Sequence, residues 1–152
     1  MTADSENTAT GFRILNWIGI IEQLMTHRAG RRLESLALTV PQFALLNHFS
    51  HRPDERRTVT QLARVMQQTQ PAITKTVKAL VAAGYLSART DKDDRRVKWL
   101  KLTARGEKVR ARAIDLMGPD IAEMFGDWRA EEMDELMALL DRLKRYLDEN
   151  RP

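Results

Sequence analysis

The chain has 152 residues, of which 43% are hydrophobic and 30% are charged, and this length suits one domain with a sizeable core. It contains no cysteine, which excludes disulfides, thiolate metal ligands and thiol-based oxidant sensing. The polar and acidic N-terminus lacks the features of a signal peptide, and no run approaches the ~18 uncharged apolar residues that a membrane span needs. We therefore expect a soluble, cytoplasmic protein.

The net charge of +4 is unevenly distributed along the chain. Residues 56–112 contain 15 Lys and Arg against 4 Asp and Glu, a net charge of +11, so the remainder carries −7. Segregated charge of this kind is expected when one part of a protein faces a polyanion. An isolated basic run is more often a solvated surface, but this one coincides with the motifs described below.

The first predicted helix covers residues 12–30 and follows a tail, residues 1–11, that we expect to be disordered. Two adjacent apolar stripes at helical spacing run along this helix: Ile14, Ile18, Ile21 and Met25, and beside them Trp17, Ile20 and Leu24. Together the stripes cover more than half of its circumference, which predicts burial on two sides. A second helix over residues 42–51, with Pro41 in its first turn, is followed by a polar loop over 53–57.

Two short helices joined by a tight turn come next. Thr58 and Gln61 have the spacing of a capping box, and Thr69 is a good N-cap before Pro71. In the second of these helices the side chains of Ile73, Val77, Leu80 and Val81 form a buried stripe and leave a polar face outward. This pattern is typical of a helix-turn-helix.

A hairpin follows Gly84, with a charged tip over residues 91–96 and a return strand over 97–102. Thr103 is placed to cap a long helix over 104–128, and we expect a kink and interruption of that helix at Gly118-Pro119. A last helix starts at Ala130 and repeats leucines at i, i+4, i+7 and i+11, namely Leu136, Leu140, Leu143 and Leu147. A helix that fits the major groove beside a basic hairpin predicts DNA binding.

These elements carry motifs that resemble the MarR family of bacterial winged-helix transcription regulators over roughly residues 12–147. The motifs are Leu38-Thr39-x-x-Gln42-Phe43-x-Leu45-Leu46, Gln61-Leu62-Ala63, Ile73-Thr74-x-x-Val77-x-x-Leu80, Gly84-Tyr85-Leu86, Asp91-x-x-Asp94-Arg95-Arg96 and Leu102-Thr103-x-x-Gly106. The last two are the most specific. Gln67, where many members have a turn glycine, and Pro71, where a small hydroxyl residue is frequent, depart from the pattern.

The resemblance implies a mainly α fold with a small β-hairpin wing. It places a winged helix-turn-helix domain at residues 35–103, between dimerisation helices at 12–34 and 104–152. The family binds pseudo-palindromic double-stranded DNA as a homodimer. The interface residues implied here are Ile14, Ile18, Leu136, Leu140, Leu143 and Leu147.

The same resemblance implies which residues meet DNA. The second helix of the motif and its surroundings would face bases and phosphates through Arg64, Gln68, Thr69, Gln70, Ala72, Thr74, Lys75 and Lys78. The alternative for Thr69 is that it serves only as a helix cap. Arg95 would enter the minor groove, with Arg96 beside it, while Asp94 would position Arg95 or its neighbour, because phosphates repel a carboxylate.

The family often senses small aromatic or phenolic acids between its dimerisation helices and its DNA-binding lobe. The corresponding residues are Trp17, Ile21, Phe43, Asn47 and His48. Ordinary hydrophobic core is the competing interpretation, and for an aromatic residue on a helical stripe it is the commoner one.

We expect no enzyme activity, no cofactor and no metal. His48 and His51 lie at i, i+3 with His27 elsewhere, but no carboxylate sits nearby to complete a metal site. No phosphate-binding glycine loop or nucleophile triad is present. The expected function is a sequence-specific, ligand-released repressor. The alternative is an architectural DNA-binding protein with little sequence preference and no ligand.

Overall fold

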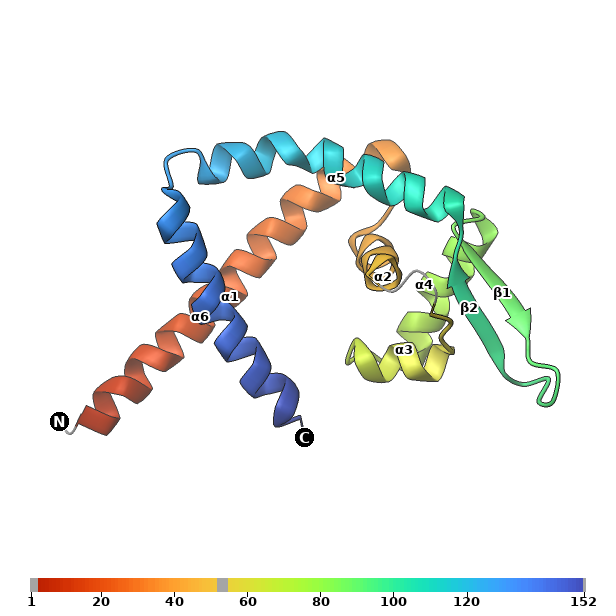
Figure 1. Ribbon diagram of the computed structural model, residues 1–152, viewed down its shortest axis with the longest axis horizontal. Coiled ribbons are helices and arrows are strands. Elements are labelled where there is room, and N and C mark those ends of the chain that lie inside the picture. Colours follow the sequence, from red (N-terminus) through yellow and green to blue (C-terminus); the bar gives the residue numbers. More distant parts are fainter. Residues whose placement is uncertain (1–2, 52–54, 152) are drawn as a thin grey trace. The chain divides into compact units, whose positions relative to one another are not determined.

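The computed structural model describes residues 3–51 and 55–151, and α-helices dominate it (Figure 1). The elements in chain order are α1 (Ala3–Leu33), the 3-10 turn η1 (Glu34–Leu36), α2 (Val40–Ser50), α3 (Val59–Val65), α4 (Gln70–Ala82), β1 (Leu86–Thr90), β2 (Lys98–Leu102), α5 (Ala104–Phe125) and α6 (Ala130–Glu149). The chain divides into two compact units between Met117 and Gly118. The predicted class, mainly α with one antiparallel hairpin, is confirmed.

Threonine side chains set where α2, α3 and α4 begin. Thr58 accepts a hydrogen bond from the backbone N–H of Gln61 at 3.2 Å, and the Gln61 side chain accepts the Thr58 N–H at 3.0 Å, so the predicted capping box is confirmed. Thr39 and Gln42 form a second capping box, which starts α2 two residues earlier than predicted. Thr69 caps α4 through the N–H of Ala72.

The turn between α3 and α4 places Gln67 in the left-handed region, with φ of 50°. A glycine would suit position 67, because the left-handed conformation is costly for most residues that have a Cβ atom. The turn is closed by the N–H of Gln68, which donates to the carbonyl of Ala63 at 3.0 Å.

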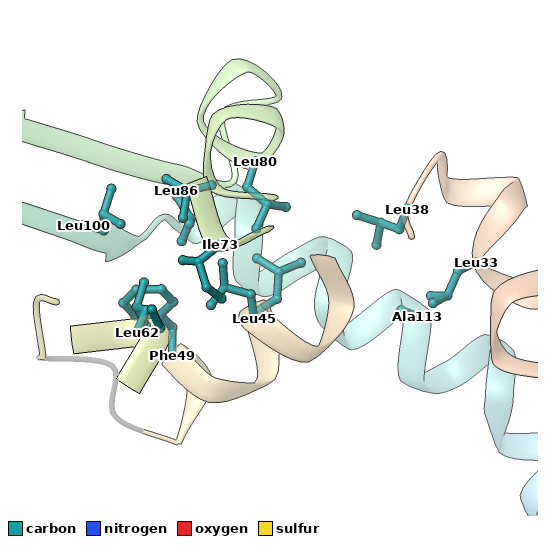
Figure 2. Packing of buried hydrophobic residues seen from close by; sticks show 13 residues of the cluster. Leu33, Leu38, Leu45, Phe49, Leu62, Ile73, Leu80, Leu86, Leu100 and Ala113 are labelled. Atoms are coloured by element: carbon teal, nitrogen blue, oxygen red, sulfur yellow. The ribbon is translucent and has the colours of Figure 1, made fainter. Parts of the chain in front are cut away.

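One hydrophobic cluster holds the first unit together, as Figure 2 shows. Its buried members come from the helices α1 to α5, from both strands and from the residue Leu38 before α2: Leu33, Leu38, Leu45, Leu46, Phe49, Leu62, Ala63, Ile73, Val77, Leu80, Leu86, Leu100 and Ala113. The predicted inward stripe of α4 is confirmed for Ile73, Val77 and Leu80. Because that stripe is buried, the opposite face of α4 must point to solvent.

The Leu-Thr-x-x-Gly motif has a local structural cause at the base of the hairpin. The Thr103 hydroxyl lies 2.7 Å from the Gly84 carbonyl oxygen and accepts the N–H of Gly106 at 3.0 Å, so it ties the start of α5 to the end of α4. Gly84 itself has φ of +76°, which favours glycine there. Gly106 is buried, and a Cβ on it would stand 2.2 Å from the Tyr85 carbonyl oxygen.

Replacing Gly106 with Ala should therefore destabilise the fold by about 3 kcal/mol, because overpacking against backbone cannot be relieved by a side-chain rotation. Urea unfolding followed by circular dichroism measures the effect. Gly11→Ala is the control, since a Cβ placed there meets nothing within 4 Å beyond its own chain neighbours and helix backbone, and a helical Gly-to-Ala change is mildly stabilising. Equal stability of wild type and Gly106→Ala would contradict this account of the motif.

Three predictions about element boundaries are wrong. Helix α1 begins at Ala3, so residues 3–11 are helical and not a disordered tail; nothing before Gly11 in this segment breaks a helix. Helix α5 runs through Gly118 and Pro119 without interruption and ends at Phe125. An internal proline removes one N–H donor and crowds the preceding turn, but a helix can accommodate it without ending there. Arg57, expected in a polar loop, exchanges two backbone hydrogen bonds with Leu100 at the edge of β2.

The first half of α5 packs on the same core as the helix-turn-helix. Gly106 and Ala113 on the first half of α5 are buried, and Ala113 belongs to the same cluster as the core of the helix-turn-helix. This half of α5 therefore belongs to the first unit. Residues 53 and 54 of the predicted polar loop lie outside the described part of the chain.

Candidate nucleic-acid interface

The outer face of α4 presents a polar surface that can contact DNA bases. Gln70, Pro71, Thr74, Lys75 and Lys78 line a shallow hollow on this face. An amide, a hydroxyl and two ammonium groups are donors and acceptors of the kind that contact base edges and phosphates in a major groove. The structure thus gathers four of the residues predicted for DNA binding on one surface.

The remaining predicted residues of this motif lie around the start of α4. Gln68, Thr69 and Ala72 are exposed, and so is Arg64 in the last turn of α3. The Thr69 hydroxyl is used as a helix cap, 3.4 Å from the N–H of Ala72. The Gln70 amide donates to the hydroxyl of Thr60 at 3.3 Å, a contact that sequence analysis did not anticipate. It links the first turns of α3 and α4.

The wing is the hairpin β1–β2, in which Leu86 pairs with Leu102 and Arg89 pairs with Trp99. Asp91 organises its tip, because one carboxylate oxygen accepts the backbone N–H groups of Asp93 and Asp94 at 2.9 and 3.0 Å. The other oxygen accepts the indole N–H of Trp99 at 2.6 Å. These hydrogen bonds, above all the one from Trp99, lower the pKa of Asp91.

Asp94 binds Arg96 and not Arg95, which decides between the two alternatives left by the sequence. Its carboxylate accepts the Arg96 backbone N–H at 2.9 Å and the Arg96 Nε–H at 3.2 Å. The hydrogen bond from the Arg96 side chain lowers the pKa of Asp94. Arg95 is exposed at the tip, where a guanidinium can enter a groove.

A second group of residues near the wing was missed by sequence analysis. The guanidinium carbon of Arg56 lies 4.6 Å from the centre of the Trp99 ring, within the range of a cation–π interaction. Trp99 is half-buried on β2 and is anchored by its hydrogen bond to Asp91. The sequence feature that could have drawn attention to this site is the tryptophan that lies between Lys98 and Lys101 in the predicted wing strand.

The residues predicted for effector binding fall into two sets. Trp17 and Ile21 are exposed on α1, at 62% and 56%, and lie outside the hydrophobic cluster that Phe43 joins. Asn47 and His48 lie on α2, as Phe43 does. The Asn47 side-chain oxygen accepts a hydrogen bond from Arg110 at 3.3 Å, and Arg110 also pairs with Glu107 at 2.6 Å. That pair lowers the pKa of Glu107 and raises that of Arg110.

Each compact unit carries a helix with exposed apolar side chains. On α1 the exposed fraction of Ile14 is 51%, while Ile18 is half-buried. On α6 Leu140 and Leu147 are exposed, and Leu136 and Leu143 are half-buried. Single apolar side chains on a surface are ordinary, but rows of them along a helix indicate an interaction surface.

No group of three or more His, Asp or Glu residues in the described ranges is arranged to hold a metal ion. Over the same ranges, no helix combines the length and apolar character needed to cross a membrane.

The helix-turn-helix with its exposed α4 face and the two-stranded wing define a winged helix-turn-helix protein, a class that binds DNA. The model of the MarR family matches residues 38–97, which run from before α2 to the wing tip. The chain is therefore similar to the MarR family of transcriptional regulators over its helix-turn-helix and wing, and the solved structures described below share its fold.

Three solved structures illustrate the similarity. The transcriptional regulator BldR from Sulfolobus solfataricus is 28% identical, covers 95% of this chain and 99% of its own, and superposes with a TM-score of 0.73. A MarR protein from Peptoclostridium difficile is 22% identical, with coverages of 90% and 88% and a TM-score of 0.75. A mutant MarR from E. coli complexed with operator DNA is 23% identical, with coverages of 94% and 99% and a TM-score of 0.70.

Proposed function

We propose that this protein is a sequence-specific repressor that binds a pseudo-palindromic operator as a homodimer and is released by a small aromatic or phenolic ligand. The observation that carries the proposal is that one lobe presents both a polar α4 face and an arginine-tipped wing. As a protein that binds chromosomal DNA, it would act in the cytoplasm.

The chemistry of the α4 face supports direct reading of bases. Gln70 can form two hydrogen bonds with adenine, the methyl groups of Ala72 and Thr74 can touch thymine methyls, and Lys75 can reach guanine or a phosphate. Lys78 and Arg64 suit phosphates, which fix the position of the protein on DNA without reading sequence. The thymine contact is open to Ala72 because it is exposed near the start of the helix.

The homodimer is supported by the apolar side chains that α1 and α6 expose in a single chain. A two-fold dimer presents two copies of α4, which must stand ~34 Å apart, one helical turn of DNA, to enter successive major grooves. A two-fold protein then requires a pseudo-palindromic site.

The alternative function, an architectural DNA-binding protein, makes a different prediction about specificity. A regulator should bind its selected site ~10³-fold or more tightly than random DNA, whereas an architectural protein should show a ratio near one. Selection from a random-sequence pool, followed by affinity measurements on the enriched duplex and on a scrambled duplex at physiological salt, decides between them. A ratio near one would defeat the repressor proposal.

Release by a ligand can be tested separately from DNA specificity. A ligand that lowers operator affinity ~100-fold must prefer the non-binding conformation by about 2.7 kcal/mol. Trp17 and Phe43 offer aromatic side chains, and His48 or the arginines at 28, 31 and 32 could neutralise a carboxylate.

We expect a benzoate or phenol in a titration panel to weaken operator binding and to quench tryptophan fluorescence with saturation. The affinity is measured on the enriched duplex, and cyclohexanecarboxylate serves as the non-aromatic control. Operator affinity that is indifferent to every compound, with no saturable quenching, would leave a constitutive repressor or an unrelated inducer.

A further inference from the structure

Arg56 pairs with Trp99 on the wing strand β2, and neither residue belongs to the hydrophobic cluster. Arg56 is exposed, and its guanidinium is held over the face of the Trp99 ring. The ring is itself tied to the wing tip, because its indole N–H donates to Asp91, whose other oxygen binds the backbone of the turn. The wing therefore holds a cation that belongs to a different segment of the chain.

Backbone contacts show where this cation sits. The next residue, Arg57, exchanges hydrogen bonds of 3.0 and 2.8 Å with Leu100 on β2. The residue after it, Thr58, caps α3, and Thr60 in the first turn of α3 binds the Gln70 side chain at the start of α4. Arg56 thus lies on the segment that joins the wing to the first turns of α3 and α4.

In the proposed complex α4 occupies a major groove and the wing tip enters the adjacent minor groove. One sugar–phosphate strand separates two adjacent grooves, and it must pass between these two elements. A guanidinium stacked on a ring still directs N–H groups outward, and it loses less side-chain freedom on binding an anion than a free arginine does.

We propose that Arg56, held in place by Trp99, binds a phosphate of the DNA strand between the two grooves. This inference rests on the proposed DNA-binding function and adds a phosphate contact and its positioning residue. Arg56 makes the contact, and Trp99 acts through Arg56.

The test measures how DNA affinity depends on salt concentration, because the steepness of this dependence reports the number of phosphate contacts. Removal of one contact should lower the slope of log affinity against log salt by about 0.9. Arg56→Ala should therefore weaken binding of the full-length protein to its selected duplex. The ratio of wild-type to variant affinity should be about 3.5-fold larger at about 50 mM salt than at about 200 mM. A scrambled duplex should show the same change in slope.

Arg105→Ala is a matched control. Arg105 also stacks on an aromatic ring, with its guanidinium carbon 5.6 Å from the centre of Tyr85, but at the base of the hairpin near the C-terminal end of α4. The two substitutions change the charge equally. We expect Arg105→Ala to leave the salt slope unchanged.

The positioning role of Trp99 is tested by a double-mutant cycle with Trp99→Leu, which removes the aromatic face but keeps an apolar side chain. Arg56→Ala should weaken binding less in the Trp99→Leu background than in the wild type. Circular dichroism and thermal unfolding establish that each variant is folded.

The phosphate contact would be overturned if Arg56→Ala had the same salt slope as the wild type. It would also be overturned if Arg105→Ala lowered the slope as much as Arg56→Ala does. An unchanged effect of Arg56→Ala in the Trp99→Leu background would overturn the positioning role. Failure of the wild type to prefer its selected duplex would instead defeat the proposed function, so the two failures are distinguishable.

Discussion

Replacing both Leu140 and Leu143 with Glu should give unfolded or aggregated protein, because these side chains lie on the apolar stripe of α6 that we propose to cover in a homodimer. In the single chain Leu140 is 40% exposed and Leu143 is half-buried, with Leu139 and Leu147 exposed nearby. A buried carboxylate left without a partner costs roughly 3–5 kcal/mol, and the dimer would bury two copies of each. Few proteins of this size are stable enough to absorb such a loss.

Light scattering after size exclusion, together with circular dichroism, measures the result. Arg142→Glu is the matched control, since it changes the net charge of the chain by the same −2 on an exposed part of the same helix. We expect this control to remain a folded dimer. A well-folded, stable monomer of the Leu140 and Leu143 variant would defeat the claim that dimerisation is obligatory.

Arg95→Ala should lower the affinity for all DNA sequences by about tenfold, which is ~1.4 kcal/mol. The loss should be largest where the flanks of the site are rich in A·T pairs, because narrow minor grooves there have the most negative potential. Lys75→Ala and Gln70→Ala should behave differently. Each should change the preference among operator variants and cost about 1–3 kcal/mol if its contact is to a base.

Fluorescence anisotropy with a panel of duplexes that differ in the half-site or only in the flanks separates these effects. Arg96→Ala is the neighbouring control, and it should have a smaller effect, because Arg96 is engaged by Asp94 in the structure. If Arg95→Ala left affinity unchanged at physiological salt, the wing would be only a structural hairpin.

Local sequence signals predicted the helix-turn-helix and the wing because their causes are local. The capping box at Thr58 and the N-cap at Thr69 involve residues three positions apart. The inward stripe of α4 follows from helical periodicity alone. The exposed face of α4 could therefore be predicted residue by residue, and so could the charged wing tip.

The amino-acid sequence by itself thus determined the class of fold, the start of each helix of the motif and the face of α4 that carries the polar side chains. Tertiary structure alone decided that Arg57 joins β2, that Gln70 binds Thr60, and that Arg56 stacks on a tryptophan 43 positions later. It also decided that Asp94 holds Arg96 and that Gly106 packs against the Tyr85 carbonyl. The physical reason is that these contacts depend on where the hairpin packs and on which rotamer a charged side chain adopts, and neither leaves a periodic signal in the sequence.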